Sequence, residues 1–90
     1  MLRLRLSRDA GSFIATREPK HKRQIAGRIQ TLRDDPVPAD SKMLKGADRE
    51  YRRADIGQYR IIYRADDDTL YVAAIGKRND DEVYRRLRRK

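Results

Sequence analysis

The sequence predicts an α+β domain built on a four-stranded, largely antiparallel sheet. Apolar residues alternate with arginines at the N-terminus, recur at helical spacing in the middle of the chain and form strand-like runs after residue 50. Short turns separate the last three segments, which makes that part of the sheet antiparallel. We therefore expect two N-terminal helices on one face of the sheet and a short C-terminal helix.

The first 17 residues predict a strand and then a short helix. Three leucines alternate with arginines over residues 1–6, the pattern of a strand with one buried face. Ser7 is placed as the N-cap of a helix that runs to about Arg17, with Phe13 and Ile14 as its core contacts.

A second helix is predicted to begin at Pro19, because proline suits the first turn of a helix. Ile25, Ile29 and Leu32 follow at steps of four and three residues, with cationic side chains on the other faces. Two prolines in the segment 34–40 end the helix, since each disfavours helical geometry in the residue before it.

Three strands are predicted next, from Tyr51 to Ile56, from Tyr59 to Ala65 and from Thr69 to Ile75. The connecting residues 57–58 and 66–68 are few enough for hairpin turns. Three consecutive antiparallel strands are therefore expected.

A final helix is predicted close to the C-terminus. Asn79 or Asp80 can serve as its N-cap, and Val83 and Leu87 lie four residues apart on one face. The cations of residues 85–90 lie at its C-terminal end, where the helix dipole favours positive charge.

Composition points to one small basic domain, residues 1–90, with a polyanionic partner. The 90 residues carry 23 Lys and Arg against 14 Asp and Glu, a formal charge of +9. Nucleic acid is the first candidate partner, although an acidic protein or an anionic membrane surface would also be attracted. The chain has no cysteine, no signal-peptide pattern and no apolar run of membrane-spanning length, so a soluble protein of the reducing cytoplasm is expected.

The segment from Tyr51 to Tyr84 carries the candidate chemistry. Arg60 and Arg78 are suited to clamp a phosphate, because a guanidinium is always charged and donates two parallel hydrogen bonds. Tyr84 could stack on a base or transfer a proton. Each residue has a plainer interpretation, since most arginines of so basic a chain are solvated and an isolated tyrosine is usually a core residue.

This segment resembles the RelE toxins of bacterial and archaeal toxin–antitoxin pairs. The residues that carry the resemblance are Lys42-Met43-Leu44-Lys45-Gly46, the Tyr51 to Arg53 strand, Gly57-Gln58-Tyr59-Arg60-Ile61-Ile62-Tyr63, Gly76-Lys77-Arg78 and Glu82-Val83-Tyr84. The resemblance implies an endoribonuclease that enters the ribosomal A site and cuts messenger RNA by attack of the RNA's own 2′-hydroxyl, with neither metal nor cofactor. It also implies a tightly bound antitoxin, which we expect to be acidic.

The resemblance assigns roles to individual residues. Arg60 and Arg78 match the family's phosphate-contacting arginines, Tyr84 matches its C-terminal catalytic tyrosine, and Arg53 is expected to assist. Residues expected to hold RNA or the ribosome are Lys42, Lys45, Arg52, Lys77, Arg85 and Arg86.

The chain departs from the family pattern in the strand before Gly57. RelE proteins place two basic residues one apart there. Counting back from Gly57 finds Arg53 and then Asp55, whereas counting forward from Tyr51 finds Arg52 and then Ala54. Either way one cation, the catalytic lysine, is missing. Asp55 or Glu50 could replace it as the base, or could simply pair with an arginine.

Two other functions stay open from the sequence. One is a gyrase inhibitor like the ParE toxins, which share the fold without the RNA-cutting residues. The other is a weakly active relative that binds an antitoxin and represses its operon. His21, the sole histidine, is interpreted as a surface residue, and Asp66, Asp67 and Asp68 as a turn rather than a cation site.

Overall fold

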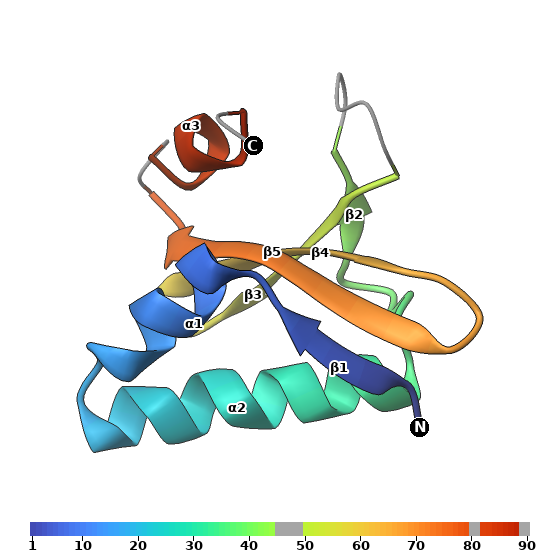
Figure 1. Cartoon of the computed structure of the whole chain (residues 1–90), viewed down its shortest axis with the longest axis horizontal. Helices are drawn as coiled ribbons and strands as arrows, with labels where there is room; N and C mark the ends of the chain where they lie inside the picture. The colour runs from blue at the N-terminus through green and yellow to red at the C-terminus, as the bar shows by residue number, and fades with distance from the viewer. Residues whose placement is uncertain (45–49, 80–81, 89–90) are drawn as a thin grey trace.

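A computed structural model describes residues 1–44, 50–79 and 82–88 of the chain (Figure 1). The five strands are β1 (Arg3–Leu6), β2 (Lys42–Met43), β3 (Arg52–Ile56), β4 (Tyr59–Ala65) and β5 (Thr69–Lys77). The three helices are α1 (Arg8–Ala15), α2 (Pro19–Asp34) and α3 (Glu82–Arg88). None of the described helices is long and apolar enough to cross a membrane.

The sheet has the order β1-β5-β4-β3-β2, with β1 parallel to β5 and the other pairs antiparallel. Helices α1 and α2 lie on one face of this sheet and α3 lies on the other (Figure 1). The α+β class, the two N-terminal helices on one face and the three consecutive antiparallel strands are therefore confirmed. The α1/α2 side is called the helix face below, and the other side the α3 face.

The expected number of four strands is wrong, because β2 adds a fifth at the sheet edge. In β2, Lys42 pairs with Arg53 and Met43 with Arg52. Two residues are too few to show an alternating pattern, so sequence periodicity cannot detect such a strand. Strand β5 also continues two residues past its expected end at Ile75, to Lys77.

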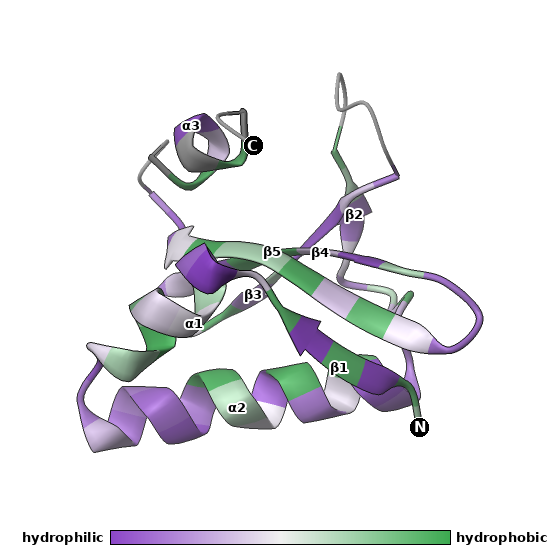
Figure 2. Cartoon of the chain, in the orientation of Figure 1, coloured by the Kyte–Doolittle hydropathy of each residue, from purple (hydrophilic) through white to green (hydrophobic). Residues whose placement is uncertain are grey.

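The main core lies between the sheet and the helix face. Ile25, Ile29 and Leu32 of α2 are buried there as predicted, and Phe13 and Ile14 of α1 pack against the same cluster. Figure 2 shows apolar residues on the side of α2 turned toward the sheet. Burial of these side chains accounts for the position of both helices.

A bulge in β5 lets that strand serve two cores. Ile62 pairs with Ala74 and Tyr63 pairs with Val72, which leaves Ala73 as an extra residue. The alternation therefore shifts: Val72 and Ile75 both join the main core, whereas Ala74 joins Ile62 on the α3 face. A strand without the extra residue would direct Ile75 to the other face, since side chains alternate strictly.

Ser7 joins the start of α1 to this bulge. Its hydroxyl accepts a hydrogen bond from the backbone N–H of Ala10 at 3.0 Å and donates one to the carbonyl of Ala73 at 2.6 Å. Ser7 is therefore the helix cap that the sequence predicts and also a link between β5 and α1.

Replacing Ser7→Ala is expected to lower the free energy of unfolding by about 1–3 kcal/mol, because it removes the cap and the link to Ala73 together. Urea denaturation of the purified protein measures this change. The matched control is Ser12→Ala, an exposed serine of the same helix, for which a change within about 0.5 kcal/mol is expected. Equal losses in the two variants would contradict the assigned role.

Candidate functional site

Strand β3 places Arg53 and Asp55 on the α3 face. Ala54 and Ile56 pack into the main core on the helix face, and successive side chains of a strand point to opposite faces. Of the two ways of counting along this strand, the fold therefore agrees with the count back from Gly57, which selects Arg53 and Asp55. Asp55 lies directly opposite Arg60 of β4, so a carboxylate and a guanidinium become cross-strand neighbours.

Arg60 is the centre of the cluster on this face. Its Nε donates to Oδ1 of Asp55 at 2.8 Å and its Nη2 lies 3.2 Å from Oδ2, a two-point contact. Its Nη1 donates to the hydroxyl of Tyr84 at 2.8 Å. The Arg60 side chain is only 15% exposed, so these contacts fix its orientation.

Arg78 forms the open side of the cluster. Its Nε lies 3.5 Å from Oδ2 of Asp55, and its Nη1 donates to the carbonyl of Gly57 at 3.2 Å. The turn at Gly57 favours a glycine, because φ there is +57°, a backbone conformation that other residues rarely adopt. The Arg78 side chain is 54% exposed and can meet a ligand directly.

Helix α3 brings Tyr84 to Arg60 by burying the neighbouring residue. Val83 is buried against Ile62 and Ala74, and Leu87, one helical turn later, packs on the same cluster. Because this small core fixes α3 on the sheet, the phenol of Tyr84 reaches the Arg60 guanidinium. Apolar packing in α3 thus determines the geometry of a polar site.

The electrostatics of the cluster favour an ionised Asp55. The hydrogen bonds from Arg60 lower the pKa of the Asp55 carboxyl, with smaller contributions from the charges of Arg60, Arg78 and Arg53, while partial burial opposes them. The same contact with Asp55, together with the hydrogen bond to Tyr84, raises the pKa of Arg60 against the opposing effect of burial. A carboxylate with a lowered pKa holds protons weakly and is a poor general base at neutral pH.

Four of the predicted site residues lie together. Arg60 donates to Tyr84, and Arg60 and Arg78 both contact Asp55. Arg53 lies on the same face, two residues before Asp55. Lys42 is exposed and pairs with Arg53, so it shares this face at the sheet edge. Arg85 is exposed on α3.

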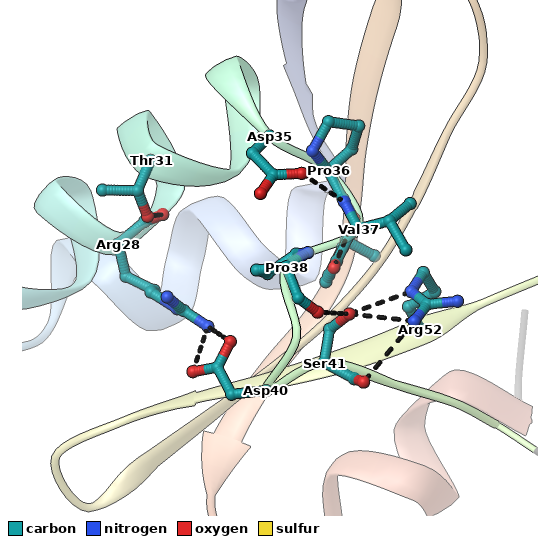
Figure 3. Close-up of polar contacts among 10 residues, drawn as sticks. Arg28, Thr31, Asp35, Pro36, Val37, Pro38, Asp40, Ser41 and Arg52 are labelled. Atoms are coloured by element: carbon teal, nitrogen blue, oxygen red, sulfur yellow. Dashed lines mark hydrogen bonds and ion pairs between the residues drawn. The ribbon is translucent and has the colours of Figure 1, made fainter.

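Other predicted residues lie elsewhere. Arg52 is on the helix face, where its guanidinium donates to the hydroxyl of Ser41 at 2.9 and 3.1 Å (Figure 3). Lys77 is exposed but pairs with Tyr59 of the main core, which places it on the helix side of the sheet. Glu50 is exposed just before β3. Lys45 and the side chain of Arg86 lie outside the described residues.

The interpretation of His21 as a surface residue is wrong. Its Nδ1 shares a hydrogen bond with the hydroxyl of Tyr59, and the ring is half-buried against that tyrosine. His21 precedes the buried Ile25 by four residues and thus lies on the same side of α2. This spacing indicates the buried side of α2 but does not identify Tyr59 as the partner. The turn at residues 66–68 is confirmed, since Asp66 accepts from the backbone N–H groups of Asp68 and Thr69.

Asp55→Asn is expected to destabilise the protein most at neutral pH. Since the pKa of Asp55 is lower in the folded state than its usual value near 3.9, the ionised carboxylate stabilises the fold above about pH 4. That contribution disappears as the pH falls through the folded-state pKa. Urea unfolding at pH 7 and at successive values below pH 4 measures the difference between the two proteins.

The control for this experiment is a double-mutant cycle with Arg60→Gln. The two substitutions should be coupled at pH 7, because each removes the same ion pair, and independent at the lowest pH. Coupling that does not change with pH would contradict the assignment.

Solved structures with the same fold come from bacterial and archaeal toxins. A RelE–RelB complex of Pyrococcus horikoshii OT3 aligns with a TM-score of 0.73 and 23% identity over 86% of this chain and 94% of its own. The RelBE2 complex of Mycobacterium tuberculosis gives 0.73 and 21% over 86% and 98%. The isolated RelE toxin of E. coli gives 0.73 and 18% over 99% and 97%. At these identities the likeness concerns the fold.

A search of curated proteins returned no match to the chain. The family model described as the ParE toxin of type II toxin–antitoxin systems, parDE, matches residues 7–82. This range includes the cluster residues Asp55, Arg60 and Arg78 and ends before Tyr84. The chain therefore belongs to the ParE toxin family of type II toxin–antitoxin systems, within the RelE/ParE superfamily.

Proposed function

We propose that this toxin cuts messenger RNA on the ribosome by metal-independent attack of the RNA's own 2′-hydroxyl. The observation that carries the proposal is the contact between Arg60 and Tyr84, with the exposed guanidinium of Arg78 on the other side of Asp55. In this proposal the two cations and the phenol act on a single phosphodiester. Structural neighbours include the RelE, YafQ and YoeB toxins, which supports the assignment to this group.

The proposed reaction needs few groups from the protein. The 2′-hydroxyl gives up its proton to solvent water as its oxygen attacks phosphorus and forms a new P–O bond. The bond to the 5′-oxygen breaks, which leaves a 2′,3′-cyclic phosphate and a 5′-hydroxyl. Arg60 and Arg78 neutralise the charge that develops on the phosphate oxygens, the effect that is often the largest share of catalysis. Because Tyr84 accepts from Arg60, its own phenolic hydrogen is available for the leaving 5′-oxygen.

Asp55 acts in this scheme as a competitor of the substrate. In the free protein its carboxylate takes the two-point contact of Arg60 that a phosphate would otherwise accept. An incoming phosphodiester has to displace it. The lowered pKa of Asp55 argues against its use as the base, so the RNA-cutting activity rests on the arginines and the phenol.

The partners follow from the same proposal. A cognate antitoxin neutralises the toxin in the cytoplasm, as RelB-type proteins are found bound in the RelE complexes with this fold. The charge of +9 favours an acidic antitoxin. Arg53, Lys42, Lys77 and Arg85 remain proposed RNA contacts, as do Lys45 and Arg86. Arg52 is not retained, because hydrogen bonds to Ser41 already engage its guanidinium.

Arg60→Ala is expected to slow the cleavage of ribosome-bound message by about 10² to 10³-fold, the usual effect of removing one well-aimed electrostatic donor. Tyr84→Phe should slow it by about 10²-fold or more, since the ring is kept while the transferable proton and the acceptor for Arg60 are both lost. Single-turnover cleavage with purified ribosomes measures both rates.

Two further variants separate charge from geometry. Arg60→Lys keeps the charge but cannot make the planar two-point contact, so it should remain slow. Arg23→Ala removes an exposed arginine of α2 and should cleave like the wild type. Wild-type cleavage by Arg60→Ala, in a protein with native circular dichroism, would refute the assigned role.

Asp55→Asn is expected to bind a single-stranded RNA fragment several-fold more tightly than the wild type. It should cleave at least as fast, because the amide oxygen still accepts from Nε of Arg60 and keeps the guanidinium oriented. The amide leaves Arg60 and Arg78 free of an anionic competitor. Fluorescence anisotropy with a labelled oligonucleotide measures binding. A fall in cleavage of about 10² to 10⁴-fold without weaker binding would instead identify Asp55 as the base. If only Asp55→Lys cleaves, the result would favour the alternative function, in which this chain is a weakly active RelE relative that binds an antitoxin and represses its operon.

The match to the ParE family model favours a second candidate, inhibition of DNA gyrase. The two functions predict different first effects of expression in cells. A nuclease toxin depletes full-length messenger RNA while DNA stays intact. A gyrase inhibitor induces the DNA-damage response while messenger RNA stays intact, and that outcome would replace our proposal.

A further inference from the structure

A second basic cluster lies at the opposite end of the α3 face. Arg5 of β1, Tyr71 of β5 and Arg64 of β4 are aligned in register across three neighbouring strands. Together with Thr69 and Asp66 they line an open pocket of about 340 Å³. This volume lies at the lower end of the range for sites that hold small ligands.

The residues of this second cluster are suited to a nucleotide. The Arg64 guanidinium lies 4.8 Å from the centroid of the Tyr71 ring, so a flat cationic and aromatic surface is already assembled. The Nε of Arg64 is buried and has no hydrogen-bond partner among the described residues. Arg5 is exposed and available to a phosphate. Bases stack on such surfaces, and arginine holds the adjoining phosphate.

Asp66 does not make the pocket anionic. Its Oδ1 accepts from the backbone N–H groups of Asp68 and Thr69, so the carboxylate is used to close the turn between β4 and β5. The lining residues carry two positive charges, on Arg5 and Arg64, and one negative charge, which leaves a net charge of +1.

The second cluster is separated from the Arg60 cluster by α3. Arg64 is four residues from Arg60 along β4, or about 13 Å at the usual rise of a strand. Between them lies Ile62, which Val83 of α3 covers. A short RNA strand held at Arg60 would have to pass around the helix to reach Arg64. A large folded RNA can instead contact both sides of α3 at once.

We infer that Arg5, Arg64 and Tyr71 form a binding site for an unstacked nucleotide of ribosomal RNA, with the base on Tyr71 and Arg64 and the phosphate on Arg5. The inference rests on the proposed ribosomal function and adds a separate anchor to it. Its residues take no part in the bond-breaking step, so the site affects ribosome affinity and leaves the affinity for short substrate RNA unchanged.

Arg5→Glu tests the site by reversing an exposed charge at the rim of the pocket. We expect the affinity for purified ribosomes that carry no message to fall at least fivefold. The slope of log affinity against log salt should become shallower by the amount that one phosphate contact contributes. Arg23→Glu, an equal charge change on exposed α2, should have a clearly smaller effect. Co-sedimentation at several salt concentrations measures both.

Tyr71 gives a second, independent readout. Tyr71→Phe keeps the stacking surface and should bind ribosomes like the wild type, whereas Tyr71→Ala should bind about five- to a hundred-fold more weakly. Circular dichroism of both variants checks the fold. If Tyr71→Ala is unfolded, Arg5→Glu and its control decide the question alone.

The outcomes distinguish this inference from the proposed function. Equal ribosome affinity of Arg5→Glu and Arg23→Glu, with wild-type toxin that cleaves message, overturns the second site only. If Arg5→Glu loses as much affinity for a short message oligonucleotide as for ribosomes, the assignment to ribosomal RNA is overturned. Wild-type toxin that does not bind ribosomes at all removes both proposals.

Discussion

The pairing of β3 with β4 is the constraint on which the candidate site depends. It places Asp55 opposite Arg60, and the resulting ion pair holds the guanidinium so that its remaining edge faces Tyr84. A shift of one residue in this register would turn Asp55 toward the main core and separate the three groups. Ala54 and Ile56 prevent that shift, since their burial on the helix face would be lost.

The bulge in β5 is a second constraint on the geometry of the site, in the strand that neighbours β4. Because Ala73 is inserted there, β5 packs against α1 and α2 and also supplies Ala74 to the small core beneath α3. Ser7 holds the bulge to the start of α1. The position of Tyr84 thus depends on apolar contacts spread over the whole domain, and the polar site is a consequence of two cores on opposite faces of one sheet.

Much of this arrangement could be predicted from the sequence. Regular apolar spacing predicted α2 through Ile25, Ile29 and Leu32, and a strand-like run between two short turns predicted β4, so both were expected with nearly their observed bounds. Two features had too weak a local signal. Strand β2 has only two residues, and the contact of His21 with Tyr59 joins positions 38 residues apart. The pairing of Asp55 with Arg60 could be predicted only if the register of β3 against β4 were known. Counting along the sequence allowed two alternatives for the residues on the site face.

The chemical ends of the RNA products test the central claim most directly. Purified toxin incubated with ribosomes and a labelled message should give fragments that end in a 2′,3′-cyclic phosphate and begin with a 5′-hydroxyl, and only while Arg60 is present. Mass spectrometry of the fragments distinguishes these ends from the alternatives. Uncut message, or fragments with a 3′-hydroxyl and a 5′-phosphate, would contradict the account, because neither follows from attack by the neighbouring 2′-oxygen.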